Sequence, residues 1–212
     1  VYEALAGHGG RNLEGVEQAA AWARLEEESG NLRAALAFTL ERDPRRCLEV
    51  ATRLAMHWDA QGQNREARRW LEPALEAYTE PSELRYRGLA ALVASLTATG
   101  DYIPARRAGD ELLASAAMHG STQWEARGHH VLGVLDHFVG DVAAARGHFE
   151  AYLANARSMG SPFHVARGLI SLGQLARAEG ELEEARAANE EAAAVFTEQA
   201  NTFGASVCMD NL

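Results

Sequence analysis

The 212-residue sequence contains no lysine, so all twenty of its positive charges are arginines. This absence excludes several chemistries from the chain. It can supply neither a P-loop lysine for ATP nor a lysine that forms a Schiff base or anchors pyridoxal phosphate. Aromatic residues are also few, at 7%, and proline occurs only five times.

Cysteine is scarce as well. The two copies, Cys47 and Cys208, lie far apart and form no motif. So small a number favours a reducing compartment, and we expect a cytoplasmic protein. No apolar run approaches the roughly eighteen residues of a transmembrane helix, and no signal peptide is visible. We therefore expect no membrane association.

The charge balance is acidic, with a formal net charge of −10 at pH 7. A domain that grips DNA through its phosphates is usually basic, so we expect no direct binding to nucleic acid. Alanine, with forty-two copies, is the most frequent of the apolar residues. Because alanine favours helix and the sequence holds little proline, it predicts an all-α protein.

A pattern repeats along the chain with a period of forty residues. Its marks are a glycine before an acidic residue, an Ala-Arg dipeptide five residues later, an Arg-Gly dipeptide and a leucine. They occur at Gly100, Gly140 and Gly180; at Ala105, Ala145 and Ala185; at Arg87, Arg127 and Arg167; and at Leu92, Leu132, Leu172 and Leu212. An earlier copy holds Gly62 and Ala67. Agreement at so many positions indicates internal repeats.

Each period reads as two antiparallel helices, because apolar residues recur at spacings of three and four, as at Leu132, Leu135 and Val139. Helix pairs stacked at a fixed period predict a right-handed α-solenoid. We expect this array to continue beyond the sequence. The predicted parts are a lead-in with an irregular helix pair at 1–42, four helix pairs at 43–80, 81–120, 121–160 and 161–200, and the start of a further repeat at 201–212.

The helix ends carry recognisable signals. Gly140 is predicted to stop one helix in the left-handed conformation, and Asp141 to cap the next. Ser161 is predicted as another cap, and Thr122 with Glu125 as a capping box.

Small residues also fall inside the predicted helices. A glycine there costs about 1 kcal/mol relative to alanine, so we expect each to mark a close approach between helices. The alanines at 67, 105, 145 and 185 form one column that would let long helices stack. The internal glycines are Gly88, Gly128, Gly133, Gly168 and Gly173.

These marks resemble the tetratricopeptide repeat. Leu132-Gly133, Gly140-Asp141, Ala145 and Phe149 stand at that family's Leu-Gly, Gly-Asp, Ala and Phe positions, and Leu172-Gly173, Gly180 and Ala185 repeat them. The period of forty exceeds the family's usual value of about 34, so we expect helices about one turn longer. The resemblance implies a solenoid whose concave groove is lined by the first helix of each pair.

A narrower resemblance concerns the N-terminal third. The segments 22–36 and 62–71 resemble parts of large bacterial LuxR-type and AfsR-like ATPase-containing transcriptional regulators. That family implies a nucleotide-binding switch domain and a DNA-binding module elsewhere in the parent protein. It also implies that the repeats sense an inducer or hold a partner.

One stripe on the first helix of each pair would face the implied groove. Read at helical spacing, its candidate binding residues are Asp59; Arg87; Arg127, His130 and His137; and Arg167, Gln174 and Arg177. The three arginines at 87, 127 and 167 would form a ladder for carboxylates or phosphates, because a guanidinium binds both through paired hydrogen bonds. The alternative is a solvated row of arginines paired with neighbouring glutamates.

Other site chemistries find no support in the spacing. Neither His129 nor His130 stands three or four residues from His137, so no helical metal site is predicted. Neither cysteine has a histidine partner nearby, and no Gly-x-Ser-x-Gly motif occurs. We expect no catalytic residue, metal or cofactor.

The sequence therefore predicts a non-enzymatic sensor or scaffold domain of a bacterial regulator of transcription or signal transduction. It would bind a protein, a peptide or a small acidic inducer in its groove, and contact neighbouring modules of the parent protein. The alternative is a structural spacer or a self-association platform, such as a homodimer, with no ligand of its own.

Overall fold

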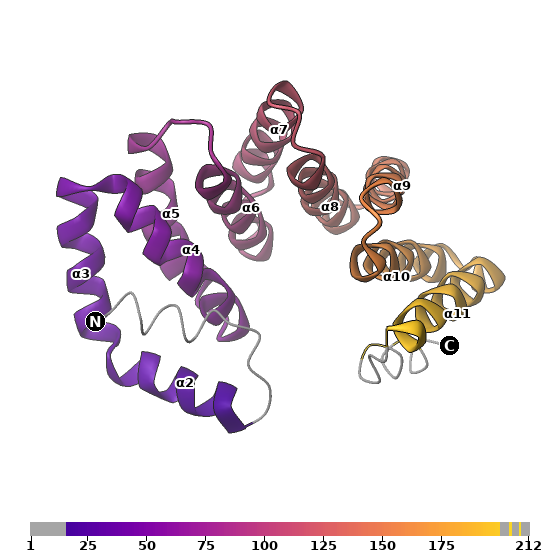
Figure 1. Cartoon of the computed structure of the whole chain (residues 1–212), viewed down its shortest axis with the longest axis horizontal. Coiled ribbons are helices and arrows are strands. Elements are labelled where there is room, and N and C mark those ends of the chain that lie inside the picture. Colours follow the sequence, from indigo (N-terminus) through magenta and orange to yellow (C-terminus); the bar gives the residue numbers. More distant parts are fainter. Residues whose placement is uncertain (1–15, 200–203, 205–207, 209–212) are drawn as a thin grey trace. The chain divides into compact units, whose positions relative to one another are not determined.

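The computed structural model describes residues 16–199 together with Gly204 and Cys208. Apart from these two residues, the predicted start of a further repeat at 201–212 lies outside the described residues. Every regular element described is an α-helix (Figure 1). In chain order the helices are α2 (Val16–Glu27), α3 (Ser29–Arg42), α4 (Pro44–Ala60), α5 (Asn64–Ala77), α6 (Glu83–Ala98), α7 (Tyr102–Met118), α8 (Thr122–Val139), α9 (Val142–Ser158), α10 (Pro162–Glu179) and α11 (Leu182–Glu198).

The chain divides into two compact units, one ending at Ala108 and the other beginning at Gly109, within α7. In the first unit α3, α4, α5 and α6 pack in chain order, and α4 also contacts α6. In the second unit α8 packs on α9, α9 on α10, and α10 on α11. Contacts between helices that follow each other in the sequence are typical of a solenoid, so the predicted all-helical solenoid of helix pairs is confirmed. None of the described helices combines the length and apolar character needed to cross a bilayer.

The glycine stop and the acidic cap between α8 and α9 are confirmed. Gly140 ends α8 with a φ of 82°, a left-handed conformation that favours glycine. The Asp141 side chain then accepts a hydrogen bond from the Ala144 N–H at 3.1 Å. This turn reverses the chain and places α9 against α8.

Of two other predicted caps, the capping box of Thr122 and Glu125 is wrong and the N-cap position of Ser161 is confirmed. Ser121 rather than Thr122 stands at the N-cap of α8, so Thr122 and Glu125 do not form a capping box. Ser161 stands at the N-cap of α10, but its side chain caps no backbone N–H. Its hydroxyl oxygen lies 2.6 Å from Nδ1 of His164 instead. A side-chain partner one turn ahead has replaced the backbone as the hydrogen-bonding partner of this serine.

The small residues lie where helices approach closely. Ala67, Ala105, Ala145 and Ala185 are all buried. A methyl group added at Gly133 on α8 would lie 2.7 Å from the ring of Phe149 on α9, closer than real contacts allow. The predicted close approach is therefore confirmed at this glycine.

Arginine–carboxylate pairs, whose two members stand thirty-three residues apart, join one helix pair to the next. Arg33 on α3 lies 2.8 Å from Glu66 on α5, and Arg68 on α5 bonds Asp101 just before α7. In the second unit Arg146 on α9 lies 2.7 Å from a carboxylate oxygen of Glu179 on α10 and also bonds Glu184 on α11. Such partly exposed pairs each contribute up to about 1 kcal/mol.

We expect Gly133→Ala to lower the free energy of unfolding by about 1–2 kcal/mol. Overpacking against a buried ring costs about 1–3 kcal/mol, and the better helix propensity of alanine offsets up to about 1 kcal/mol of that cost. Gly147→Ala on α9 is the matched control, because its added methyl would meet no atom within 4 Å. That control should stabilise the protein by about 0.5–1 kcal/mol. Urea denaturation measures both effects, and two changes of the same sign would contradict the close-approach interpretation.

Candidate functional site

The predicted stripe residues of the first unit are surface groups. Asp59 lies exposed near the end of α4. Arg87 on α6 is also exposed, and its guanidinium lies 2.6 Å from the Glu83 carboxylate one turn earlier. At Arg87 the structure thus agrees with the alternative of a solvated, glutamate-paired arginine. The ladder of Arg87 with the arginines of the second unit stays a prediction.

In the second unit three of the predicted residues gather in one place. Arg127 and His130 share a face of α8 because they lie three residues apart, and Arg167 approaches them from α10. The other predicted residues are exposed on the later turns of the same two helices: His137, Gln174 and Arg177.

His130 and Arg167 are joined by a hydrogen bond between α8 and α10. The Nε–H of Arg167 donates to Nε2 of His130 at 3.1 Å. Because a guanidinium can only donate, Nε2 must be unprotonated and Nδ1 of the neutral imidazole must carry the hydrogen. Among the described residues this Nδ1 is buried and has no hydrogen-bond partner. His130 thus offers one unused N–H donor.

Aromatic rings hold His130 in place. The side chain is only 7% exposed, and its ring centroid lies 5.0 Å from that of Tyr152 and 6.2 Å from that of Phe149, both on α9. The Tyr152 ring in turn lies 6.2 Å from that of His164 on α10. Three helices therefore contribute to one polar cluster set against buried rings, which we call the Arg127–Arg167 site: Arg127, His130, Tyr152, His164 and Arg167.

Tyr152 and His164 are absent from the sequence prediction, which considered one face of the first helices alone. Tyr152 belongs to α9, the second helix of its pair, three residues after Phe149. The polar tip of Tyr152 on that apolar face is the signal that could have revealed it. His164 stands too early in α10 to fall in the stripe.

The charges of the site are fixed by burial and by one another. Burial, followed by the charge of Arg167, lowers the pKa of Arg127 to about 10, which leaves it charged at neutral pH. Burial, with the charges of Arg167 and Arg127, lowers the pKa of His130 to about 2, which keeps it neutral. Burial and the same two arginines also lower the pKa of His164.

No carboxylate pairs with Arg127 or Arg167 within residues 16–199. Other arginines of the same unit differ: Arg157 lies 3.0 Å from Glu191, and Arg146 bonds two glutamates. Burying a charge without an opposite partner is costly. The Arg127–Arg167 site is therefore electrostatically suited to an anionic group from another molecule.

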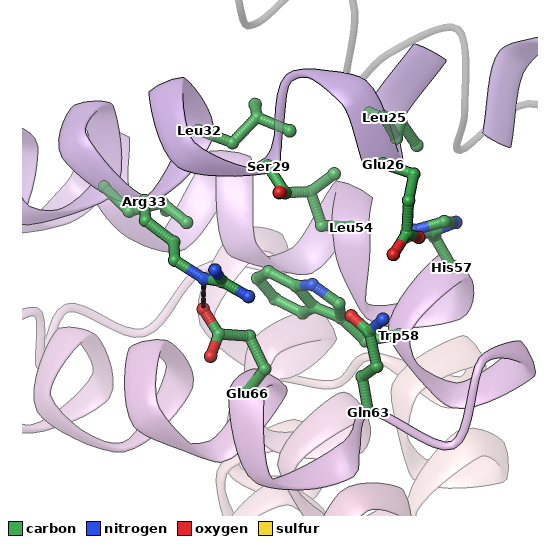
Figure 2. A pocket seen from close by; sticks show the side chains of 11 residues that line it. Leu25, Glu26, Ser29, Leu32, Arg33, Leu54, His57, Trp58, Gln63 and Glu66 are labelled. Atoms are coloured by element: carbon green, nitrogen blue, oxygen red, sulfur yellow. Dashed lines mark hydrogen bonds and ion pairs between the residues drawn. The ribbon is translucent and has the colours of Figure 1, made fainter. Parts of the chain in front are cut away.

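The first unit contains a pocket between α2, α3, α4 and α5 (Figure 2). Trp58 contributes to its apolar part, and Arg33 and Glu66 pair across its rim at 2.8 Å. Burial lowers the pKa of His57, while the nearby Glu26 opposes that shift. Its charged lining residues are Arg33, paired with Glu66, and Glu26, so the pocket lacks the excess positive charge of the Arg127–Arg167 site.

A pair of histidines lies between α8 and α9. Nδ1 of His129 lies 2.9 Å from Nδ1 of His148, and Nε2 of His148 lies 3.6 Å from the buried carboxylate of Asp136. Sequence spacing did not reveal this pair because its members come from different helices. In the part of the chain that is described, no group of three or more His, Cys, Asp or Glu side chains is arranged to hold a metal ion.

We expect stability to fall as the pH drops below about 6.5, the pKa of an unfolded histidine. His130, with a folded pKa of about 2, takes up its proton only on unfolding. The unfolded chain therefore binds more protons in this window, and the free energy of unfolding declines by up to about 1.4 kcal/mol per pH unit for this one group. His130→Phe keeps a ring against Tyr152 and should reduce the slope. Urea denaturation of both proteins between pH 7 and about 5 measures it, and equal slopes would show that His130 titrates normally.

The comparisons with known proteins bear on the fold. No family model matches the sequence, and no curated protein matches it. Solved structures do resemble it. BtubC (BKLC) from P. vanneervenii has 24% identity and a TM-score of 0.67, over 87% of this chain and 80% of that chain.

Two further structures are similar at 17% identity. A Rap protein complexed with competence and sporulation factor has a TM-score of 0.68, over 94% of this chain and 65% of that chain, so this chain spans about two thirds of the Rap chain's length. A Podosopora anserina protein described as a kinesin light chain with nearly identical TPR-like repeats has a TM-score of 0.51, over 80% of this chain and 94% of that chain. These likenesses show that the chain has a TPR-like helical repeat fold.

Proposed function

We propose that this chain is a non-enzymatic binding module of a bacterial regulator, and that it receives an acidic group of a protein, peptide or small inducer at the Arg127–Arg167 site. Stacked helix pairs present extended surfaces that suit binding rather than catalysis. The fold supports this proposal in general terms, and the charges of the second unit support it in particular.

The observation that carries the proposal is the uncompensated pair of guanidinium groups. The charge of Arg167 lies close enough to lower the pKa of Arg127, yet neither arginine has a carboxylate partner among the described residues. A bound carboxylate or phosphate would remove this repulsion and accept charge-assisted hydrogen bonds from both. Each such bond typically contributes about 1.5–3 kcal/mol where water is excluded.

The surface around the site can extend this contact. His137 follows His130 by two turns on α8, and Gln174 and Arg177 follow Arg167 by two and three turns on α10. All three are exposed and polar. They would bind the flanking part of a ligand longer than one acidic group.

The solved structures agree with a role in binding. The Rap structure is a complex with the competence and sporulation factor, and the kinesin light chain structure displays TPR-like repeats. Because these proteins are only 17% identical to this chain, the comparison supports a shared fold and does not identify a partner. The identity of the partner here must follow from the chemistry of the Arg127–Arg167 site.

Binding at the Arg127–Arg167 site would affect neighbouring modules through a change in how the helices pack. Arg167 already bonds His130 across the two helix pairs of the second unit. An anion that contacts Arg127 and Arg167 together would favour packings in which α8 and α10 hold this spacing. Such a shift in population would pass to neighbouring modules, since each pair of a solenoid rests on the next.

The alternative of a spacer that associates with itself is favoured by apolar side chains on the second unit. Phe138 is 59% exposed, Phe163 53% and Leu182 65%. Light scattering over a range of protein concentrations tests this alternative, because apolar association should raise the mean mass with concentration. A constant monomer mass would count against it.

We expect acidic peptides, selected from a displayed library of random peptides, to bind the wild-type chain and to lose at least about tenfold in affinity with Arg127→Ala or Arg167→Ala, since each removes a charge-assisted hydrogen bond. Isothermal titration calorimetry with the synthesised peptides measures this loss.

Arg157→Ala is the matched control, because it removes the same charge from an exposed arginine that is paired with Glu191. It should change affinity by less than about twofold. If the double variant Arg127→Ala with Arg167→Ala leaves every affinity unchanged, the site is not where acidic ligands bind.

A further inference from the structure

The charge of the Arg127–Arg167 site is greater than one carboxylate can balance. Arg127 and Arg167 are both charged at neutral pH, and His130 between them is neutral. A single carboxylate would leave one positive charge uncompensated next to buried rings. A phosphomonoester carries about −1.5 to −2 at pH 7, which matches the two arginines.

The hydrogen-bonding groups of the site are mostly donors. Arg127 brings its whole guanidinium, and Arg167 uses its Nε–H on His130 and retains its terminal N–H groups. Nδ1–H of His130, buried and without a partner among the described residues, adds one further donor, and Tyr152 brings a hydroxyl close to both arginines. The one acceptor nitrogen of His130 is already occupied by Arg167. A phosphate group, with three terminal oxygens, can use more of these donors than a carboxylate with two.

Arg127 and His130 keep their charge states between pH 5 and 8. The ionisable groups that face His130 are Arg127 on its own helix, Tyr152 on α9, and His164 and Arg167 on α10. The arginines keep their charges, burial raises the pKa of Tyr152, and burial together with the arginines lowers the pKa of His164. A proton taken up by His164 would add positive charge and strengthen the binding of an anion, so a loss of affinity on acidification in this range must come from the ligand.

We infer that the Arg127–Arg167 site takes a phosphomonoester dianion in preference to a single carboxylate. This inference rests on the proposed function, since it specifies the acidic group that the site receives. Two sources share this chemistry, namely a phosphorylated side chain of a partner protein and a small phosphorylated metabolite, and the experiment separates them.

Phenyl phosphate, benzoate and phthalate are the probes, titrated into the whole chain by calorimetry. At pH 7.5 phenyl phosphate should bind at least about tenfold more tightly than benzoate, because it engages both arginines. Between pH 7.5 and about 5 its affinity should fall about tenfold, because its dianion is lost around its second pKa near 6. Benzoate, whose pKa lies near the 4.3 of a glutamate side chain, should change less than about twofold.

Variants locate the binding. Arg127→Gln and Arg167→Gln should each weaken phenyl phosphate by at least about tenfold. Arg157→Gln, with the same loss of charge at an exposed ion pair on α9, should weaken it by less than about twofold. His130→Phe should weaken it while keeping the ring packing, since it removes the Nδ1–H donor. Equal weakening by Arg157→Gln and Arg127→Gln would overturn the inference, because it would indicate general attraction to positive charge.

The sources are separated by phosphorylating a hydroxyl residue in one of the selected peptides. If the phosphopeptide binds more tightly than both phenyl phosphate and its unphosphorylated form, the source is a partner protein. If phenyl phosphate binds as tightly as the phosphopeptide, the source is a small phosphorylated molecule. Both results support the phosphomonoester site.

The inference can fail while the proposed function stands. Benzoate binding as tightly as phenyl phosphate would overturn the preference over a single carboxylate. Phthalate binding as tightly would overturn the assignment to phosphate, because two carboxylates would then serve as well. Either result leaves an acidic-ligand site. The inference also fails if phenyl phosphate does not bind while the selected acidic peptides still lose affinity in Arg127→Ala. Failure of the peptides as well would remove the proposed function itself.

Discussion

The Arg127–Arg167 site depends on close helix packing at Gly128 and Gly168, the glycines that directly follow its two arginines. A methyl group on Gly168 would lie 3.3 Å from both Tyr152 and Leu153 on α9, and one on Gly128 would lie 3.3 Å from Leu113 on α7. A larger side chain at 168 would push α10 away from α9. Arg167, the preceding residue, would then lose its reach to His130. The absence of a side chain at Gly168 thus helps to set how closely α10, and with it Arg167, approaches α9.

Helical periodicity explains how much of this could be predicted. The forty-residue period gives the helix pairs, the glycine stops and the equivalent faces that carry Arg127 and Arg167, because all of these follow from spacing along one chain. Tyr152 and the pairing of His129 with His148 could not be predicted in this way. Contacts between helices depend on how each helix is rotated about its axis and how the helices cross, which sequence intervals do not specify.

Ser161 stands at the predicted N-cap but lacks the side-chain bond of a cap, for a related physical reason. A serine before a helix can bond a backbone N–H or a nearby side chain, and local sequence does not decide between them. At Ser161 the histidine one turn later provides a partner for the hydroxyl. His164 in turn packs its ring against Tyr152. His164, in the first turn of α10, thus both bonds the N-cap serine and belongs to the Arg127–Arg167 site.

The arginine–carboxylate ties have a consequence for how such a chain can grow. In Arg33–Glu66, Arg68–Asp101 and Arg146–Glu179 the partners stand thirty-three residues apart, less than one repeat. A tandem duplication of forty residues would therefore copy an arginine together with a carboxylate within its reach. The duplicated repeat would therefore already contain the arginine and the carboxylate that form its ion pair, and it would need no partner from a distant part of the chain. Mostly local contacts of this kind also favour fast folding, so added length need not slow the assembly of each pair.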